Sequence, residues 1–559
     1  MAKAKKIERT RAQESTNAIE KLYISMRHLF SRGFYKPMGV SGETLRKSLL
    51  SLRPEIYGSI AEDRVELNGL AYVIERLPQG IEECQFINLT ADEGYSDSHF
   101  ETIIPPKRRR NCYRIDKNQM NIEITRGRSE IYDILTHLTF LFIESHKIQK
   151  RVTLSQGKDF VREWKHLEEI VVFNKRISEE EREVSIAHLG NILGRTFDEV
   201  MAIHKVFQTV ENTDRFFHLI YWLGKLGIDE VLAQKKRTVT FSSVLIEEIG
   251  HHIYGEIWAN NIKAILKENN LLQRPIHIIS ANMHSVLNAI YAQGALPKEA
   301  HKNKGFELYQ LLSNADSKPL QKKVKDYASE NGLLYVKDTS GTNINVQIID
   351  TDKINFEVSP FTKENSIDEH AVIIVMDYAF GEQAYETMDE LLKPYKVDKT
   401  NNFLDVKSVS IMGKAGVLEG GKGDIMIPSA HIFEGTADNY PFTNELSKED
   451  LKGFGVNVFD GSMISVLGTS LQNKDVLSFF HDSTWNVIGL EMEGAHYQKA
   501  IQSASKIRGN ISENVKVRYA YYASDNPLET GATLASGGLG MTGVTPTYAI
   551  TQKILEQIF

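Results

Sequence analysis

The sequence predicts an α/β protein, with a C-terminal three-layer α/β domain built on a mixed sheet and a mainly helical region before it. Three observations support this prediction. The 559 residues are 42% hydrophobic and include 66 Lys plus Arg against 73 Asp plus Glu, which is typical of folded globular domains. Apolar residues recur at helical spacing over residues 129–269. From residue 371 to the end, strand and helix patterns alternate, as they do in layered α/β domains.

The N-terminal half begins with a mixed region and continues as helices. Over residues 17–34 apolar side chains recur at three- and four-residue spacing, and Gly33 marks the end of the predicted amphipathic helix. The residues that follow show no single pattern until the helical periodicity begins. We therefore expect a mixed α/β region over residues 1–125 and a helical bundle over residues 126–272.

The C-terminal half combines strands with helices. Its first part, residues 273–366, is predicted to be an α/β connecting segment, with strands at 276–280, 333–336 and 344–349 and a helix at 285–291. Residues 367–559 form the predicted three-layer domain. Its strands are expected at 371–376, 409–412, 425–428, 487–490 and 515–522, and its helices at 382–392, 494–507 and 546–558.

Composition argues against several classes of protein. The formal charge of −7 gives no reason to expect nucleic acid, and the basic clusters at residues 3–11 and 107–110 do not alternate with aromatic side chains. Cys84 and Cys112 are too few for a disulfide scaffold, which favours a reducing compartment, and we expect the cytoplasm. Residues 1–15 are mostly polar, and no run approaches about 18 apolar residues, so we expect no membrane insertion.

The helical region contains one possible metal motif. Glu248 and His251 have the Glu-x-x-His spacing found in di-iron helical bundles. Such a site needs a second Glu-x-x-His, and this region has none. We therefore expect its histidines to line helix faces or polar networks, and we expect neither a metal nor a cofactor.

A glycine-rich stretch, residues 413–423, invites comparison with a phosphate-binding loop. Residues 416–422 satisfy G-x-x-x-x-G-K, but Gly423 replaces the hydroxyl that such a loop presents to magnesium, and a strand follows where a helix is needed. We expect two turns instead. Residues 413–416 would form a turn at a strand end that exposes backbone N–H groups to an anion or a ribose, and residues 420–423 would form a hairpin turn. Lys414 would reach the bound group or remain solvated.

Acidic residues follow two of the predicted strands. Glu491, Met492 and Glu493 come after the apolar strand 487–490, at the position where ligands gather in open α/β sheets. A carboxylate there can accept hydrogen bonds from vicinal hydroxyls, or it can cap the helix that follows. Ser524 and Asp525 follow the strand 515–522, where the acid could also form a turn before a proline.

Four motifs in order give this part of the chain a family resemblance. They are the acid-bearing strand and helix Met376–Glu382, the glycine-rich turn with its Gly423–Pro428 strand, the segment Glu491–Gly494 and the pair Ser524–Asp525. Residues 367–559 thereby resemble the purine nucleoside phosphorylase and nucleosidase superfamily. The residues from Ser524 to Leu528 are most similar to the AMP nucleosidase branch.

The resemblance implies a role for each motif. It implies that Asp525 protonates or hydrogen-bonds N7 of the leaving purine and that Glu493 holds the ribose hydroxyls. It also implies that Met492 packs on the sugar and that Glu382 helps to position the attacking water. The chemistry suits these residue types, since breaking an N-glycosidic bond builds positive charge on the ribose and negative charge on the base. The other expected substrate-binding residues are Glu491, Lys414, Ala415, Gly416 and Ser524.

The sequence also departs from the family pattern. The arginine that precedes the Ser-Asp pair in nucleosidases is Tyr521 here, and Arg518 is not obviously equivalent. No arginine follows Arg518, Lys414 replaces the Ser or Thr of the glycine-rich turn, and the Gly-Asp-Pro-x-Arg phosphate motif is missing. We expect an N-ribosyl hydrolase acting on a purine nucleoside or nucleotide. An inactive nucleoside sensor and a phosphorylase are the alternatives.

The remaining expectations concern assembly. We expect a homo-oligomer, with a helical N-terminal region that regulates, oligomerises or binds a partner.

Overall fold

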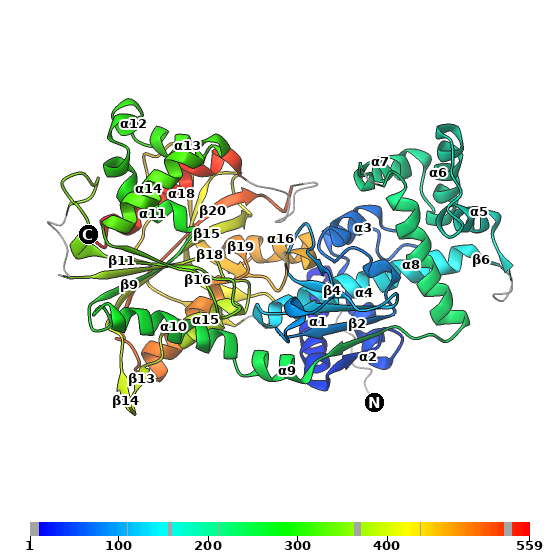
Figure 1. The fold of residues 1–559 in the computed structure, drawn as a ribbon, viewed down its shortest axis with the longest axis horizontal. Coiled ribbons are helices and arrows are strands. Elements are labelled where there is room, and N and C mark those ends of the chain that lie inside the picture. Colours follow the sequence, from blue (N-terminus) through cyan, green and yellow to red (C-terminus); the bar gives the residue numbers. More distant parts are fainter. Residues whose placement is uncertain are drawn as a thin grey trace, which may run out of the picture. The chain divides into compact units, whose positions relative to one another are not determined.

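The chain folds into two compact units, which are described separately (Figure 1). The computed structural model describes residues 10–108, 110–154, 159–210, 212–362, 370–436, 438–529 and 539–559. The first unit comprises residues up to 124 together with 130–251 and 470–476. The second unit comprises residues 125–129, 252–469 and 477–559.

The first unit contains a mixed six-stranded sheet with helices around it, in the order β1-β8-β2-β5-β4-β3. Its strands are β1 (Phe34–Tyr35), β2 (Phe86–Thr90), β3 (Thr102–Ile103), β4 (Cys112–Arg114), β5 (Gln119–Glu123) and β8 (Thr238–Phe241), with a separate pair β6 (Thr153–Leu154) and β7 (Asp159–Phe160). Its helices are α1 (Arg11–Arg32), α2 (Val40–Leu52), α3 (Leu67–Ile74), α4 (Gly127–Val152), α5 (Arg162–Val171), α6 (Glu179–Leu193), α7 (Phe197–Phe207), α8 (Arg215–Leu232) and α9 (Ser243–Gly250). The mainly helical N-terminal region predicted from the sequence is therefore confirmed.

Local sequence explains where these helices begin and end. Helix α1 starts with a capping box, in which the Thr10 side chain and the side chain of Gln13 each accept the other's backbone N–H. It ends at Gly33, whose φ of 80° lies in the left-handed region that favours glycine. Helices α6 and α7 begin with the same box, formed by Ser178 with Glu181 and by Thr196 with Glu199.

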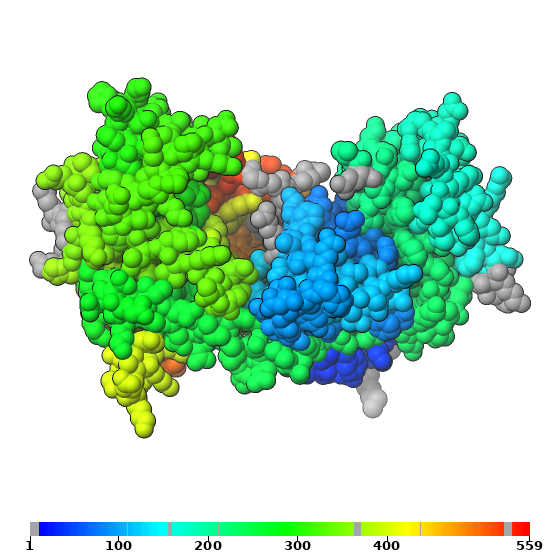
Figure 2. Space-filling model, viewed as in Figure 1, coloured from blue at the N-terminus to red at the C-terminus, as the bar shows by residue number. Residues whose placement is uncertain are grey.

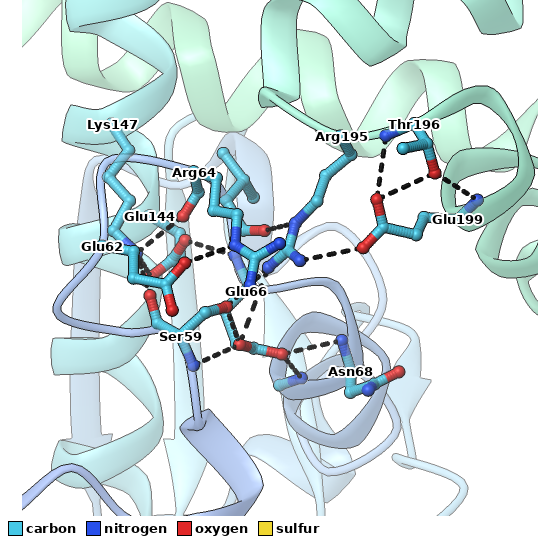
Figure 3. A network of polar contacts seen from close by, with 12 residues as sticks. Ser59, Glu62, Arg64, Glu66, Asn68, Glu144, Lys147, Arg195, Thr196 and Glu199 are labelled. Carbon is cyan, nitrogen blue, oxygen red and sulfur yellow. Dashed lines mark hydrogen bonds and ion pairs between the residues drawn. The ribbon is translucent and has the colours of Figure 1, made fainter.

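A buried polar network joins helices of the first unit (Figure 3). Glu66 Oε2 accepts the backbone N–H of Ser59 at 2.7 Å and lies 3.8 Å from Arg195 Nη2. Glu144 Oε2 accepts the backbone N–H of Glu66 at 2.8 Å, and Glu144 Oε1 pairs with Lys147 Nζ at 2.8 Å. Burial raises the pKa of Glu144 to about 7, against the opposing effect of Lys147. The network holds the residues before α3 against α4 and the start of α7.

The second unit is built on a mixed ten-stranded sheet. Its strands follow the order β10-β11-β12-β9-β15-β19-β18-β16-β17, and β20 pairs with both β15 and β16. They are β9 (Ile276–Ser280), β10 (Leu333–Val336), β11 (Val346–Asp350), β12 (Val372–Met376), β15 (Val406–Val417), β16 (Ile425–Phe433), β17 (Asn439–Pro441), β18 (Val458–Ser465), β19 (Val487–Glu491) and β20 (Lys516–Asp525). Because β15, β19, β18, β16 and β20 pair in a closed circuit, half of the sheet curls into a small barrel.

Helices cover both faces of this sheet, so the predicted three-layer α/β domain is confirmed (Figure 1). One apolar core includes side chains of α10 (Ile253–Glu268), α15 (Gln383–Leu391) and α17 (Gly494–Gln502). The other includes side chains of α11 (Met283–Ala295), α14 (Lys318–Glu330) and α18 (Val544–Glu556). The remaining helices are α12 (Pro297–Lys302), α13 (Glu307–Ser313) and α16 (Lys474–Asp482).

The sheet begins before the position that the sequence suggested. Strands β9, β10 and β11 lie in the expected connecting segment, 273–366, yet they continue the sheet of β12. Strands β17 and β18 and helix α16 were not predicted. A hairpin of β13 (Tyr395–Val397) and β14 (Thr400–Asn402) projects from the surface of this unit (Figure 2). None of the helices described has the length and apolar character needed to cross a bilayer.

Candidate functional site

The glycine-rich segment forms the middle of the candidate site, but not as a turn. Lys414, Ala415 and Gly416 lie within β15, which runs on to Val417. The expected turn at 413–416 is therefore wrong, because the backbone of this segment pairs with β20 on one side and with β9 and β19 on the other. Residues 420–423 do turn, with φ values of 100° at Gly420 and 93° at Gly423, but the expected hairpin is wrong, because β15 and β16 each pair with β20 and not with each other. The two strands that this turn joins lie on either side of β20.

Asp525 occupies the end of β20, and its carboxyl group is buried. Only 8% of the residue is exposed, and Oδ2 has no hydrogen-bond partner among the residues that the structure describes. Ser524 Oγ lies within hydrogen-bond distance of Asp525 Oδ1 and 3.1 Å from the carbonyl oxygen of Ala415. Burial raises the pKa of Asp525, while Lys414 and Lys422 oppose the rise. This environment favours the protonated acid.

The two glutamates after β19 have different surroundings. Glu491 is 2% exposed, and its Oε2 accepts the backbone N–H groups of Glu493 and Gly494 at the start of α17. Its Oε1 is hydrogen-bonded to the Ser465 hydroxyl, which also accepts the Ala495 N–H at 2.9 Å. Burial raises the pKa of Glu491 to about 8, and Glu493 adds to the rise. Glu491 therefore holds the turn together, which was the capping alternative considered for these acids.

Glu493 and Met492 point away from that turn, toward the loop after β12. Glu493 Oε1 accepts the backbone N–H of Gly381 at 2.9 Å. Met492 is 8% exposed, and its terminal carbon lies close to Gly381, 3.9 Å from where a Cβ would stand. Gly381 has a φ of 56°, so a side chain at this position would strain the backbone.

Glu382 follows Gly381 and is the N-cap residue of α15. Its backbone N–H donates to Ser129 Oγ at 2.8 Å, and its Oε1 lies 3.2 Å from Arg128 Nη1. Neither partner could be predicted from the sequence, because both precede Glu382 by about 250 residues. Arg128 and Ser129 lie in the first turn of α4, and nothing in their local sequence points to a residue so distant along the chain.

The fold brings the predicted acids to one edge of the sheet. Gly416 of β15 pairs with Leu490 of β19 on one side and with Asp525 of β20 on the other. Since neighbouring strands are about 4.8 Å apart, the ends of β19 and β20 are separated by at most about 10 Å. The Gly381 loop reaches the β19 end through Glu493. The buried acid Asp525, the carboxylate of Glu493 and the loop that carries Glu382 thus lie near the end of β15, with Lys414 near Asp525.

Other candidates lie elsewhere or serve the fold. The Arg518 guanidinium is buried in β20 and donates from Nε to Gln557 Oε1 at 2.6 Å, so it does not replace the missing arginine. Tyr521 donates to or accepts from His431 Nε2 at 3.0 Å. Among the described residues, no three His, Cys, Asp or Glu side chains are placed to hold a metal ion.

Comparisons with known proteins give a family and a set of structural neighbours. Residues 43–302 and 297–559 match a family described as "Family of unknown function (DUF6909)". A search of curated proteins gives no match. The chain is similar to Campylobacter jejuni 5′-methylthioadenosine/S-adenosyl homocysteine nucleosidase, with 11% identity and a TM-score of 0.30 over 51% of this chain and 99% of that one.

Two further neighbours have comparable scores. Futalosine hydrolase of Helicobacter pylori is 12% identical, with a TM-score of 0.29 over 51% of this chain and 99% of its own. Isoform 2 of uridine phosphorylase from Schistosoma mansoni is 12% identical, with a TM-score of 0.30 over 55% of this chain and 90% of its own.

Proposed function

The chain belongs to the DUF6909 family of unknown function, and we propose from the geometry of its site that it is an N-ribosyl hydrolase of purine nucleosides or nucleotides. One observation carries the proposal. A buried acid whose environment favours its protonated form, Asp525, ends β20, while Glu493 and Glu382 approach the same sheet edge from β19 and β12. An acid that can donate a proton, with further carboxyl groups near it, is what paired acid and charge-stabilising roles require.

Each residue has a step in the proposed reaction. Asp525 donates its proton to the purine as the N-glycosidic bond breaks, which removes the negative charge that develops on the base. Glu493 accepts hydrogen bonds from the ribose hydroxyls and stabilises the positive charge that develops on the sugar, with Met492 packed on its apolar face. Glu382 orients a water molecule and takes its proton as the water attacks the anomeric carbon. Base and ribose leave as products of hydrolysis.

The substrate class is also part of the proposal. Lys414 is exposed on β15 and lies near Asp525, and an ammonium group binds phosphate as a point charge. An AMP-like nucleotide, with its 5′-phosphate near Lys414, therefore fits better than a neutral nucleoside. Removing the ammonium by Lys414→Ala should weaken the use of AMP more than that of adenosine.

Release of free base is the direct test. The protein is incubated with AMP, adenosine, inosine and methylthioadenosine, and the free base is measured by chromatography. We expect release from at least one of the four by the wild-type protein and by Glu449→Gln, an exposed residue that pairs with Lys452 away from the site. Binding without release would favour the sensor alternative, and neither binding nor release would contradict the proposal.

A further inference from the structure

A short segment from the first quarter of the chain is built into the unit that holds the candidate site. Residues 125–129 belong to the second unit, whereas the residues on both sides of them, up to 124 and from 130 to 251, belong to the first. Within these five residues lie Arg126 and Arg128. The resemblance to nucleosidases gave them no role.

The backbone of this segment is fixed against the second unit. Asn343 Nδ2 donates to Thr125 Oγ1 at 3.2 Å. Gly127 has a φ of 74°, and a Cβ there would stand 3.2 Å from Glu386 Oε2 on α15. The guanidinium carbon of Arg126 lies 5.9 Å from the centre of the Phe380 ring. A residue other than glycine at 127 would therefore strain the backbone and crowd the helix that follows Glu382.

The end of the segment contacts Glu382 in two ways. Arg128 Nη1 lies 3.2 Å from Glu382 Oε1, with side chains only 20% and 16% exposed, so water screens the ion pair weakly. Ser129 Oγ accepts the backbone N–H of Glu382 at 2.8 Å. Arg128 also lies close enough to Glu386 to oppose the rise in the pKa of that residue, which is caused first by burial and then by Glu382. Both the main chain and the side chain of Glu382 are thus held by residues 128 and 129.

No other arginine of the described part of the chain makes an ion pair with Glu382. Tyr521, which stands where the family pattern has an arginine, is engaged with His431, and Arg518 is engaged with Gln557. The arginine beside Glu382 is therefore Arg128. It comes from a segment about 390 residues before β20, the strand in which the family pattern places an arginine.

We propose that Arg128 is a positioning residue for the hydrolytic step: it binds Oε1 of Glu382 and so aims the second carboxylate oxygen at the water that attacks the sugar. The inference rests on the proposed function. It makes the N-terminal part of the chain a contributor to the reaction, with Ser129 fixing the main chain of Glu382 and Gly127 allowing the segment to approach. A misplacement of about 1 Å in such a group costs roughly 100-fold in rate.

The test compares two arginines that pair with carboxylates of the same helix region. Arg128→Gln removes the guanidinium beside Glu382. Arg508→Gln is the matched control, because Arg508 Nη1 lies 3.3 Å from Asp389 Oδ2 on α15, one helix length from the site. Initial rates of base release are measured over a range of AMP and adenosine concentrations, in the full-length protein, with thermal unfolding recorded for every variant.

We expect Arg128→Gln to lower kcat about 10- to 100-fold with little change in KM, since the water and not the substrate is misplaced. Arg128→Lys should recover part of kcat, and added guanidinium ion should restore Arg128→Ala at concentrations that leave unfolding unchanged. Arg508→Gln should behave like the wild type.

Other results would overturn the inference. A wild-type kcat in Arg128→Gln would do so directly. A loss that neither Lys nor guanidinium restores, together with a lower unfolding temperature, would assign Arg128 to holding the fold alone. Absence of turnover in the wild-type protein would overturn the proposed function and this inference with it, which distinguishes the two failures.

Discussion

At the scale of single residues, Asp525 is the one on which the proposed chemistry depends most. Its carboxyl group is buried, Oδ2 lacks a partner among the described residues, and burial raises its pKa. An acid that keeps its proton to higher pH can donate it to a leaving base. We therefore expect Asp525→Asn to lower turnover by about 10²- to 10⁴-fold, measured as the initial rate of base release.

The same environment fixes the direction of the pH dependence. Because the pKa of Asp525 is raised, kcat should fall as pH rises through that pKa, and Asp525→Asn should lack this fall. Thermal unfolding should show that the variant stays folded. An unchanged rate in Asp525→Asn would remove the residue from the mechanism.

Glu493 offers a second test at this scale, because it has a structural contact and a proposed substrate contact. Its Oε1 accepts the Gly381 N–H at 2.9 Å, and a glutamine at 493 can still accept this bond through its amide oxygen. The substitution Glu493→Gln therefore weakens ribose binding more than it disturbs the loop. We expect kcat/KM to fall more for a ribonucleoside than for its 2′-deoxy analogue. Equal losses on both substrates would limit Glu493 to holding the loop.

At the scale of elements, the positions of the acids at strand ends could be predicted from the sequence, but the local structure at the glycines could not. Strands β12, β19 and β20 show apolar runs that end in polar residues, so the positions of Glu493 and Asp525 followed from the sequence. The glycines of β15 looked like a turn. They lie instead within a paired strand, and close approach is required across from them, at Gly489 of β19, where a Cβ would stand 2.6 Å from the carbonyl oxygen of Gly416.

Strand β18 was missed for a related reason. Gly461 interrupts its pattern, and a Cβ at this position would stand 2.7 Å from the carbonyl oxygen of Asn486. A glycine that permits close approach of two strands and a glycine that permits a turn look alike in one sequence. Only the partner strand distinguishes them.

The turn after β19 gives a prediction about stability. Burial raises the pKa of Glu491 to about 8, from an ordinary value of 4.5, so the folded state binds the proton more tightly than the unfolded state. The stability that this proton contributes is complete below about pH 4.5 and is lost as pH rises through about 8. We expect the free energy of unfolding to fall less with pH in Glu491→Gln than in the wild type. The difference between them should be a few kcal/mol at most.

Urea unfolding at several pH values between about 5 and 9 measures the effect, with the midpoint followed for the unit that contains the site. Glu449→Gln is the control. Because Glu449 is exposed, this substitution should not change how the free energy of unfolding depends on pH. The assignment would be contradicted by a Glu491→Gln variant whose stability falls with pH as steeply as that of the wild-type protein.

At the scale of the whole molecule, the boundaries of the two units differ from the positions at which the sequence pattern changes. Residues 125–129 belong to the second unit and residues 470–476 to the first, so each unit holds a segment from the other's part of the sequence. Asn473 Nδ2, for example, donates to the carbonyl oxygen of Leu52 at 2.7 Å. Contacts between residues so far apart leave no periodic signal, which is why Arg128 could not be placed beside Glu382 from the sequence.

The charged groups described at the site lead to the last prediction, that cleavage is hydrolytic. Phosphorolysis needs a dianion held beside the anomeric carbon, usually by arginine forks or several positioned donors. Here no arginine follows Arg518, the Gly-Asp-Pro-x-Arg motif is missing, and the expected turn of free N–H groups at 413–416 is a paired strand. Arg128 is engaged with Glu382. Water needs only a carboxylate that can orient it and accept its proton.

The sugar product decides between the two reactions. AMP and adenosine are supplied with and without inorganic phosphate, and the sugar is identified by mass spectrometry. We expect ribose or ribose 5-phosphate to form equally fast in both conditions, because phosphate is not a reactant in hydrolysis. Lys414 is a cation near Asp525 that could bring phosphate to the site as a reactant, so the measurement is repeated with Lys414→Ala. A rate that requires phosphate, is lost in this variant and yields ribose 1-phosphate would establish phosphorolysis and refute the proposed role of Glu382.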